Sequence, residues 1–138
     1  MVSYTVLGMM RTRPQLPRPT EAELELLNIL WDKGPATVRD VHEAVAVKRA
    51  IGYTSVLKLL QIMTEKGLVE REESGKAHIY RPVGTQQDTQ SQLVRDMSER
   101  LFSGSAAALA IHALSTQPVS DRELEELRHL IEQKRKQP

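Results

Sequence analysis

The chain has no cysteine and few aromatic residues, and both absences limit what the protein can be. Without cysteine it forms no disulfide bond, has no thiolate zinc site and offers no thiol nucleophile or thiol redox switch. Aromatic residues make up 4% of the 138 residues, which predicts a core of mainly aliphatic side chains. The hydrophobic share of 40% and the charged share of 27% are typical of a globular protein.

Long hydrophobic runs and targeting signals are also missing. No segment approaches the roughly 20 apolar residues that a membrane span needs. Residues 1–10 lack the basic start and the small-residue cleavage site of a secretory signal. We therefore expect a cytoplasmic protein with no membrane partner.

Patterns that carry catalysis or bind metal are absent from the sequence as well. His42, His78, His112 and His129 are far apart and have no metal-ligand spacing, and no phosphate-binding glycine loop occurs. The sequence therefore predicts that the protein is not an enzyme and needs neither a metal nor a cofactor.

The basic residues are unevenly distributed, although the net charge is only +1. Residues 47–66 have Glu65 as their only acid, whereas acids gather at residues 70–73 and 123–126. The basic residues of this segment are Lys48, Arg49, Lys58 and Lys66. Charge alone fits either a nucleic-acid-binding face or an ordinary solvated surface.

Residues 1–18 are rich in proline and arginine and show no apolar period, so we expect a flexible arm. Such an arm could bind DNA, along the phosphates or in the minor groove. The alternative is a disordered leader without a binding role. Thr20, with Glu23 three residues later, then predicts the capped start of a first helix, which ends near residue 32. The predicted buried stripe of this helix is Leu24, Leu27 and Trp31.

A second, shorter helix is predicted from Thr37 to about Val47, with Val38, Val41 and Val45 on its buried face. A third helix is predicted from Tyr53 to Gly67, where glycine ends it. Its inner face is Val56, Leu59, Leu60 and Met63. The segments LVERE and HIYRP, with Ser74 and Gly75 between them, predict a β-hairpin.

This order of helix, short helix, longer helix and hairpin is typical of a winged helix-turn-helix, which we place at residues 19–84. The outer face of the third helix would enter the major groove. The candidate base-reading residues are Tyr53, Thr54, Ser55, Lys58 and Gln61. The candidate phosphate contacts are Thr37, Arg39, Lys48, Arg49, Lys66, Lys76, His78 and Arg81.

One alternative is a winged helix that binds another protein in a regulatory complex. A protein-binding face usually presents large apolar or aromatic anchors, which this set of short polar groups does not provide. Another alternative for the outer face of the third helix is a merely solvated surface.

Residues 85–138 predict three further helices that form a dimerisation domain. Their apolar stripes would remain exposed in a monomer, and a second copy would bury them. The candidate dimerisation residues are Leu93, Val94, Met97, Leu101, Leu109, Leu114, Leu124, Leu127 and Ile131. The predicted fold is thus mainly α with a small β-hairpin wing, followed by a helical dimerisation segment.

The run GYTSVLKLLQIMTEKGLVEREESGKAHIYRPV resembles the penicillinase repressor family of BlaI, MecI and CopY type. The resemblance extends from Pro19 to Lys136 and includes NILWDKGPATVRDVHEAV, ERLFSGSAAALAIHAL and SDRELEELRHLIEQ. Ser55 departs from the family pattern, in which threonine is common, and this leaves the operator sequence open.

The resemblance implies a homodimer that binds an inverted-repeat operator in double-stranded DNA and represses transcription. In β-lactam-responsive members, a membrane metalloprotease sensor triggers cleavage in the C-terminal domain. The corresponding segment here lies near Leu101 to Ser103, so an inactivating protease is an expected partner. Copper-responsive members use a cysteine-rich tail, which this chain lacks.

Overall fold

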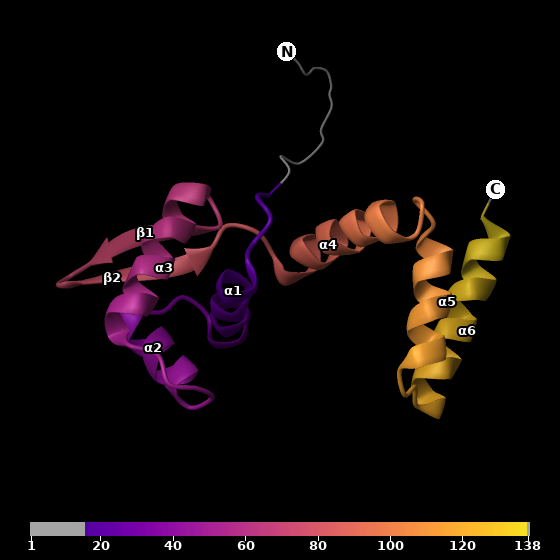
Figure 1. Ribbon diagram of the computed structural model, residues 1–138, viewed down its shortest axis with the longest axis horizontal. Helices are drawn as coiled ribbons and strands as arrows, with labels where there is room; N and C mark the ends of the chain where they lie inside the picture. Colours follow the sequence, from indigo (N-terminus) through magenta and orange to yellow (C-terminus); the bar gives the residue numbers. More distant parts are fainter. Residues whose placement is uncertain (1–15, 138) are drawn as a thin grey trace, which may run out of the picture. The chain divides into compact units, whose positions relative to one another are not determined.

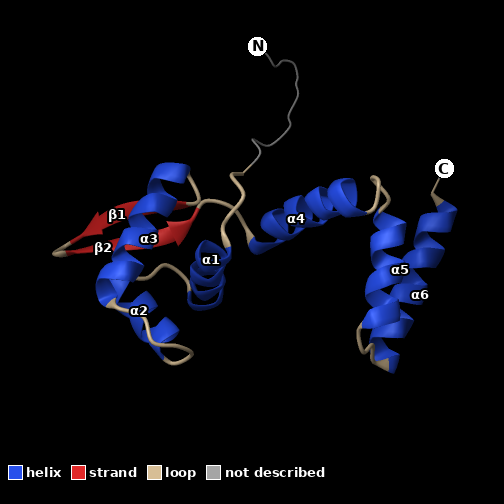
Figure 2. Ribbon diagram, in the orientation of Figure 1, coloured by secondary structure: helices blue, strands red, loops and turns tan. Residues whose placement is uncertain are grey.

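The computed structural model describes residues 16–137, which form six helices and one antiparallel hairpin (Figure 1). Figure 2 shows the helices in blue and the hairpin in red. The predicted fold class, mainly α with a small hairpin wing, is confirmed. The chain divides into two units after Leu93. Among the described residues, no helix is long and apolar enough to cross a bilayer.

The first unit contains three helices and the hairpin in the predicted order. The helices are α1 (Glu21–Lys33), α2 (Val38–Ala46) and α3 (Tyr53–Lys66). They are followed by β1 (Val69–Ser74) and β2 (Ala77–Pro82), which pair antiparallel. This order is that of a winged helix-turn-helix.

Side-chain caps start α1 and α2, and the sequence predicts the cap of α1 at Thr20 and Glu23. Thr20 Oγ1 accepts a hydrogen bond from the Glu23 amide at 3.2 Å, and Glu23 Oε1 accepts one from the Thr20 amide at 2.8 Å. Thr37 and Asp40 make the same pair of contacts at the start of α2. Each box satisfies amides that the helix leaves without a partner.

The core of the first unit is mainly aliphatic, as the composition predicts. It joins one face of each helix to Leu68, Val69 and Tyr80 of the wing region. The buried hydrophobic residues are Leu26, Leu27, Ile29, Leu30, Ala36, Val38, Val41, Val45, Val56, Leu60, Met63, Leu68, Val69 and Tyr80. Ala36 also exchanges two backbone hydrogen bonds with Tyr80, at 3.0 and 2.8 Å, which ties the α1–α2 connection to β2.

The predicted buried stripe of α1 is wrong at two of its three positions. Leu24 and Trp31 are half-buried, whereas the buried residues include Leu26 and Leu30. The reason is that α1 packs against α2, α3 and β2, so its buried surface is wider than a single stripe. Trp31 lies at the edge of this surface, where its indole Nε1–H donates to the Gly84 carbonyl at 3.1 Å.

Three helices follow the hairpin, and the division between the two units falls inside the first of them. They are α4 (Gln86–Leu101), α5 (Ala106–Thr116) and α6 (Asp121–Lys136). Ser120 and Glu123 form a capping box at the start of α6. The predicted domain boundary at residues 84 and 85 falls at the start of α4.

Most of the predicted N-terminal arm, residues 1–15, lies outside the described residues. Leu16 lies within the described residues, and its amide donates to Gln92 Oε1 of α4 at 3.1 Å. The expectation of a flexible arm at residues 1–18 stays a prediction.

Candidate nucleic-acid interface

Helix α3 has one buried and one exposed face, and the exposed face contains the residues predicted to read DNA bases. Val56, Leu60 and Met63 are fully buried in the core and fix the helix on the first unit. The helix ends at Gly67, whose φ of 84° lies in the left-handed region that favours glycine. The five predicted base-reading residues are all exposed: Tyr53, Thr54, Ser55, Lys58 and Gln61.

The N-terminus of α3 differs from those of α1 and α2 in its polar groups. Gly52 is its N-cap, so no side chain accepts a hydrogen bond from its first amides, and its first turn has no acidic residue. Both α1 and α2 have a capping box with an acidic residue in the first turn. The partial positive charge of the α3 N-terminus is therefore not neutralised by the protein, which favours an approaching phosphate.

His42 fixes the turn that leads into α3. Its Nε2 lies 2.8 Å from the Ile51 carbonyl oxygen. Its ring also meets the Tyr53 ring edge-on, with 6.0 Å between the ring centroids. Tyr53 is 49% exposed, so it joins this turn while keeping an accessible edge. No local sequence pattern indicates this role of His42.

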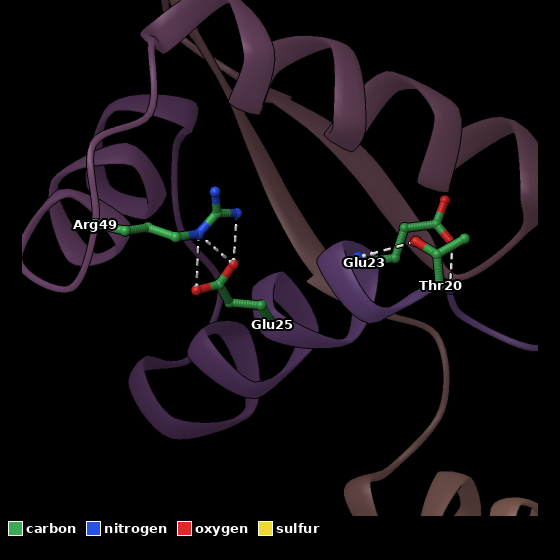
Figure 3. A network of polar contacts seen from close by, with 4 residues as sticks. All are labelled: Thr20, Glu23, Glu25 and Arg49. Atoms are coloured by element: carbon green, nitrogen blue, oxygen red, sulfur yellow. Dashed lines mark hydrogen bonds and ion pairs between the residues drawn. The ribbon is translucent and has the colours of Figure 1, made fainter.

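Arg49, a predicted phosphate contact, forms an ion pair with α1. Its Nη2 lies 2.8 Å and its Nε 3.2 Å from Glu25 Oε1 (Figure 3). The hydrogen bonds from Arg49 hold the pKa of Glu25 below its usual range. The guanidinium of Arg49 therefore already has a carboxylate partner before any DNA arrives.

Lys66, another predicted phosphate contact, also has an acidic partner. Its Nζ lies 2.6 Å from Oε1 of Glu23, the capping residue in Figure 3. Glu23 is only 2% exposed. Burial alone would raise the pKa of Glu23, but hydrogen bonds from Lys66 and Thr20 and the charge of Lys66 outweigh it and lower the pKa.

In the wing, Arg81 lies between two glutamates of the neighbouring strand. It pairs with Glu70 at 3.7 Å and with Glu72 at closer range. Lys76 follows Gly75 in the hairpin turn, is exposed, and forms no ion pair with another described residue. Lys76 is thus better placed than Arg81 to meet a phosphate.

The remaining phosphate candidates differ in whether their side chains already have a partner within the protein. Thr37 Oγ1 accepts from the Asp40 amide, and Arg39 lies 3.7 Å from Glu43 in a solvent-exposed pair. Lys48 and His78 are exposed and make no ion pair within residues 16–137, and the same holds for Lys58 among the base-reading candidates. No group of acidic or histidine side chains in the described part of the chain could hold a metal ion.

The C-terminal unit exposes apolar side chains in all three of its helical segments. The predicted dimerisation residues that are exposed are Val94, Met97, Leu101, Leu114, Leu124 and Ile131. Leu93, Leu109 and Leu127 are half-buried. Leu114 of α5 and Leu124, Leu127 and Ile131 of α6 line one hollow of about 380 Å³, together with Arg128, Glu132 and Arg135.

The family model and the curated relatives agree on one family. The family model described as penicillinase repressor matches residues 19–133. The transcriptional regulator BlaI of Mycobacterium tuberculosis H37Rv is 34% identical over 71% of this chain and 72% of its own length. The methicillin resistance regulatory protein MecI of Staphylococcus aureus N315 is 22% identical over 83% of this chain and 94% of its own.

A solved structure of Bacillus licheniformis BlaI, a monomeric form in complex with a half-operator, was also found to be similar. It aligns with 53% of this chain and 89% of its own length, at 19% identity and a TM-score of 0.47.

Proposed function

The chain belongs to the penicillinase repressor family, and we propose that it works as a homodimer that binds an inverted-repeat operator with one α3 helix in each half-site. Members of this family are DNA-binding transcriptional repressors and not enzymes. Binding to operator DNA in the cytoplasm would block transcription of the genes that follow it.

The exposed face of α3 is the observation that supports this proposal most strongly. Lys58 and Gln61 lie on it as long hydrogen-bonding side chains, with Thr54 and Ser55 near the uncapped N-terminus. Arginine or lysine pairs with guanine and glutamine pairs with adenine in the major groove, while short hydroxyl groups bind either base edges or phosphates.

The homodimer is supported by the apolar surface of the C-terminal unit. Leu124 and Ile131 of α6 are 48% and 52% exposed, and Leu101 at the end of α4 is 72% exposed. Leu124 and Ile131 line one hollow with Leu114 and Leu127, and exposed apolar patches are characteristic of interaction sites. A second copy would bury this surface with the twofold symmetry that an inverted repeat requires.

We propose that induction acts through the C-terminal unit, for example by proteolysis between α4 and α5. Leu101 is largely exposed, and the connection that follows contains Ser103 with a φ of 51° and Gly104 with a φ of 84°. An exposed connection between helices is a preferred site of proteolytic cleavage. Cleavage there would separate α5 and α6 from the DNA-binding unit, and operator affinity would fall with the loss of pairing.

Selection of bound sequences from random DNA tests the proposal. The expected product is an inverted repeat with half-sites about one helical turn, or a multiple of it, apart. Light scattering of the complex should then give two chains per duplex. Enrichment of a single unrepeated site, or one chain per duplex, would contradict the homodimer.

A further inference from the structure

His42 of α2 makes two contacts with the residues that lead into α3. Its Nε2 lies 2.8 Å from the Ile51 carbonyl oxygen. A carbonyl oxygen only accepts hydrogen bonds, so the ring donates through its Nε2–H group. The ring also meets the Tyr53 ring edge-on, with 6.0 Å between the centroids and 76° between the ring planes. One side chain therefore contacts both the residue before the N-cap of α3 and the first residue of the helix.

Helix α2 gives His42 a rigid base. Val41 and Val45 of this helix are fully buried in the core, and a capping box fixes its first turn. His42 is itself half-buried, and Ile51 packs against the same core. Tyr53, in contrast, is 49% exposed. His42 therefore fixes an accessible aromatic side chain relative to the core.

Tyr53 lies on the flank of α3 and not on its outermost side. At 3.6 residues per turn, Tyr53 lies about 60° around the helix from the buried Val56. By the same geometry, Thr54 and Lys58 lie about 160° from Val56, on the side that faces away from the core. In the major groove, the outermost side of a helix is nearest to the base edges and its flanks are nearest to the phosphates. The position of Tyr53 therefore favours a phosphate contact, although Tyr53 was predicted to read a base.

We propose that His42 is a positioning residue for operator binding, which holds the Tyr53 ring where its hydroxyl donates a hydrogen bond to a phosphate of the DNA backbone. This inference rests on the proposed insertion of α3 into the operator. Tyrosine is among the side chains that bind DNA phosphates. A side chain that is already held in its binding orientation loses less conformational freedom when the complex forms. Without the ring contact Tyr53 would exchange between rotamers, and the phosphate contact would be weaker.

The test uses the full-length chain, the operator selected from random DNA, two single variants and their combination. Tyr53→Phe removes the hydroxyl but keeps the ring beside His42. His42→Gln keeps a donor within reach of the Ile51 carbonyl but removes the ring beside Tyr53. Each single variant should weaken operator binding by on the order of tenfold. The double variant should bind within about twofold of either single variant, because His42 acts through the Tyr53 hydroxyl.

Operators with single base changes test whether Tyr53 contacts a phosphate. A phosphate contact does not read sequence directly, so Tyr53→Phe should weaken binding to all of these duplexes by about the same factor. Because the tyrosine hydroxyl is uncharged, the slope of log affinity against log salt should stay unchanged. A relaxed preference at one base position would show that Tyr53 reads a base, and would overturn the phosphate assignment.

His42→Phe separates the ring contact from the hydrogen bond. It keeps an aromatic ring beside Tyr53 but cannot donate to Ile51, so it should recover most of the operator affinity that His42→Gln loses. A merely structural role of the hydrogen bond predicts the reverse order. An affinity of His42→Phe no higher than that of His42→Gln would therefore overturn the positioning role.

The matched control is His129→Gln, which makes the same change at an exposed position of α6 and should bind like the wild type. Circular dichroism of every variant should match the wild type, which separates positioning from a loss of folding. Two further results overturn the role of His42: wild-type affinity for His42→Gln, and a double variant whose loss is the product of the single losses, about 100-fold. A wild type that selects no operator, or wild-type affinity for Lys58→Glu, instead contradicts the proposed insertion of α3, and the inference fails with it.

Discussion

Lys66 Nζ lies 2.6 Å from Glu23 Oε1, so an ion pair connects the last turn of α3 to the first turn of α1. The same carboxylate oxygen accepts a hydrogen bond from the Thr20 amide at 2.8 Å. Glu23 therefore caps α1 and fixes α3 at once. Since α3 is the proposed reading helix, we expect this ion pair to affect DNA binding by positioning α3 and not by touching the DNA.

We expect Glu23→Gln to lower the free energy of unfolding by about 2 kcal/mol at neutral pH. The substitution keeps the volume of the side chain but leaves the half-buried ammonium of Lys66 without a charged partner. Urea unfolding followed by circular dichroism measures the change. Glu21→Gln, on the exposed side of the same helical turn, is the matched control and should cost far less. Equal urea midpoints for the two variants would contradict a stabilising role of the ion pair between Glu23 and Lys66.

The same contact predicts a pH dependence of stability. The pKa of Glu23 is lower in the folded chain than in the unfolded chain. Its contribution is therefore fully present above the unfolded pKa and is lost as the pH falls through the folded pKa. The difference in unfolding free energy between the wild type and Glu23→Gln should shrink between about pH 7 and about pH 3. A difference that stays constant or grows on acidification would contradict the assignment.

The ion pairs also predict which lysines contribute to the salt dependence of DNA affinity. Lys76 forms no ion pair with another described residue, whereas Lys66 is engaged by Glu23. Lys76→Ala should reduce the slope of log affinity against log salt by about two for the dimer, one for each protomer. Lys66→Met should leave the slope unchanged, although it lowers stability.

Fluorescence anisotropy at several salt concentrations measures these slopes. A lower slope for Lys66→Met would mean that Lys66 leaves Glu23 to contact a phosphate. A wild-type affinity that hardly changes with salt would favour the protein-interaction alternative.

The sequence predicted the parts of the fold that local signals encode. Gly67 ends α3 at the predicted residue, because a left-handed residue is needed there and glycine adopts it without strain. The capping pairs of α1, α2 and α6 join residues three positions apart, so they are readable without a structure.

Contacts between distant residues could not be predicted in the same way. Glu23 and Lys66 are 43 positions apart, and Leu16 and Gln92 are 76 apart. No periodicity relates residues at such distances, so Lys66 was predicted as a phosphate contact and Leu16 as part of a flexible arm. The base-reading set on α3 stays a prediction, although its members are all exposed.

The apolar surface of α6 predicts how the dimer can be disrupted. Ile131→Glu places a charge on a side chain that is 52% exposed and lines the hollow between α5 and α6. Burying that charge in an interface would cost several kcal/mol, so the variant should be monomeric at micromolar concentration. Light scattering measures the mass, and circular dichroism should be unchanged. Arg122→Glu, at a highly exposed position of the same helix, is the control and should remain dimeric.

The most direct test of the account is the effect of Lys58→Glu on operator binding. Lys58 is exposed on α3 and makes no ion pair within the described part of the chain, so its reversal should leave folding and dimerisation intact. The control is Lys134→Glu, which makes the same change of charge on α6. In a gel-shift assay on the selected operator, Lys58→Glu should weaken binding by about 100-fold or more, while the control binds like the wild type. Wild-type affinity for Lys58→Glu, with unchanged circular dichroism in both variants, would contradict the claim that α3 reads the operator.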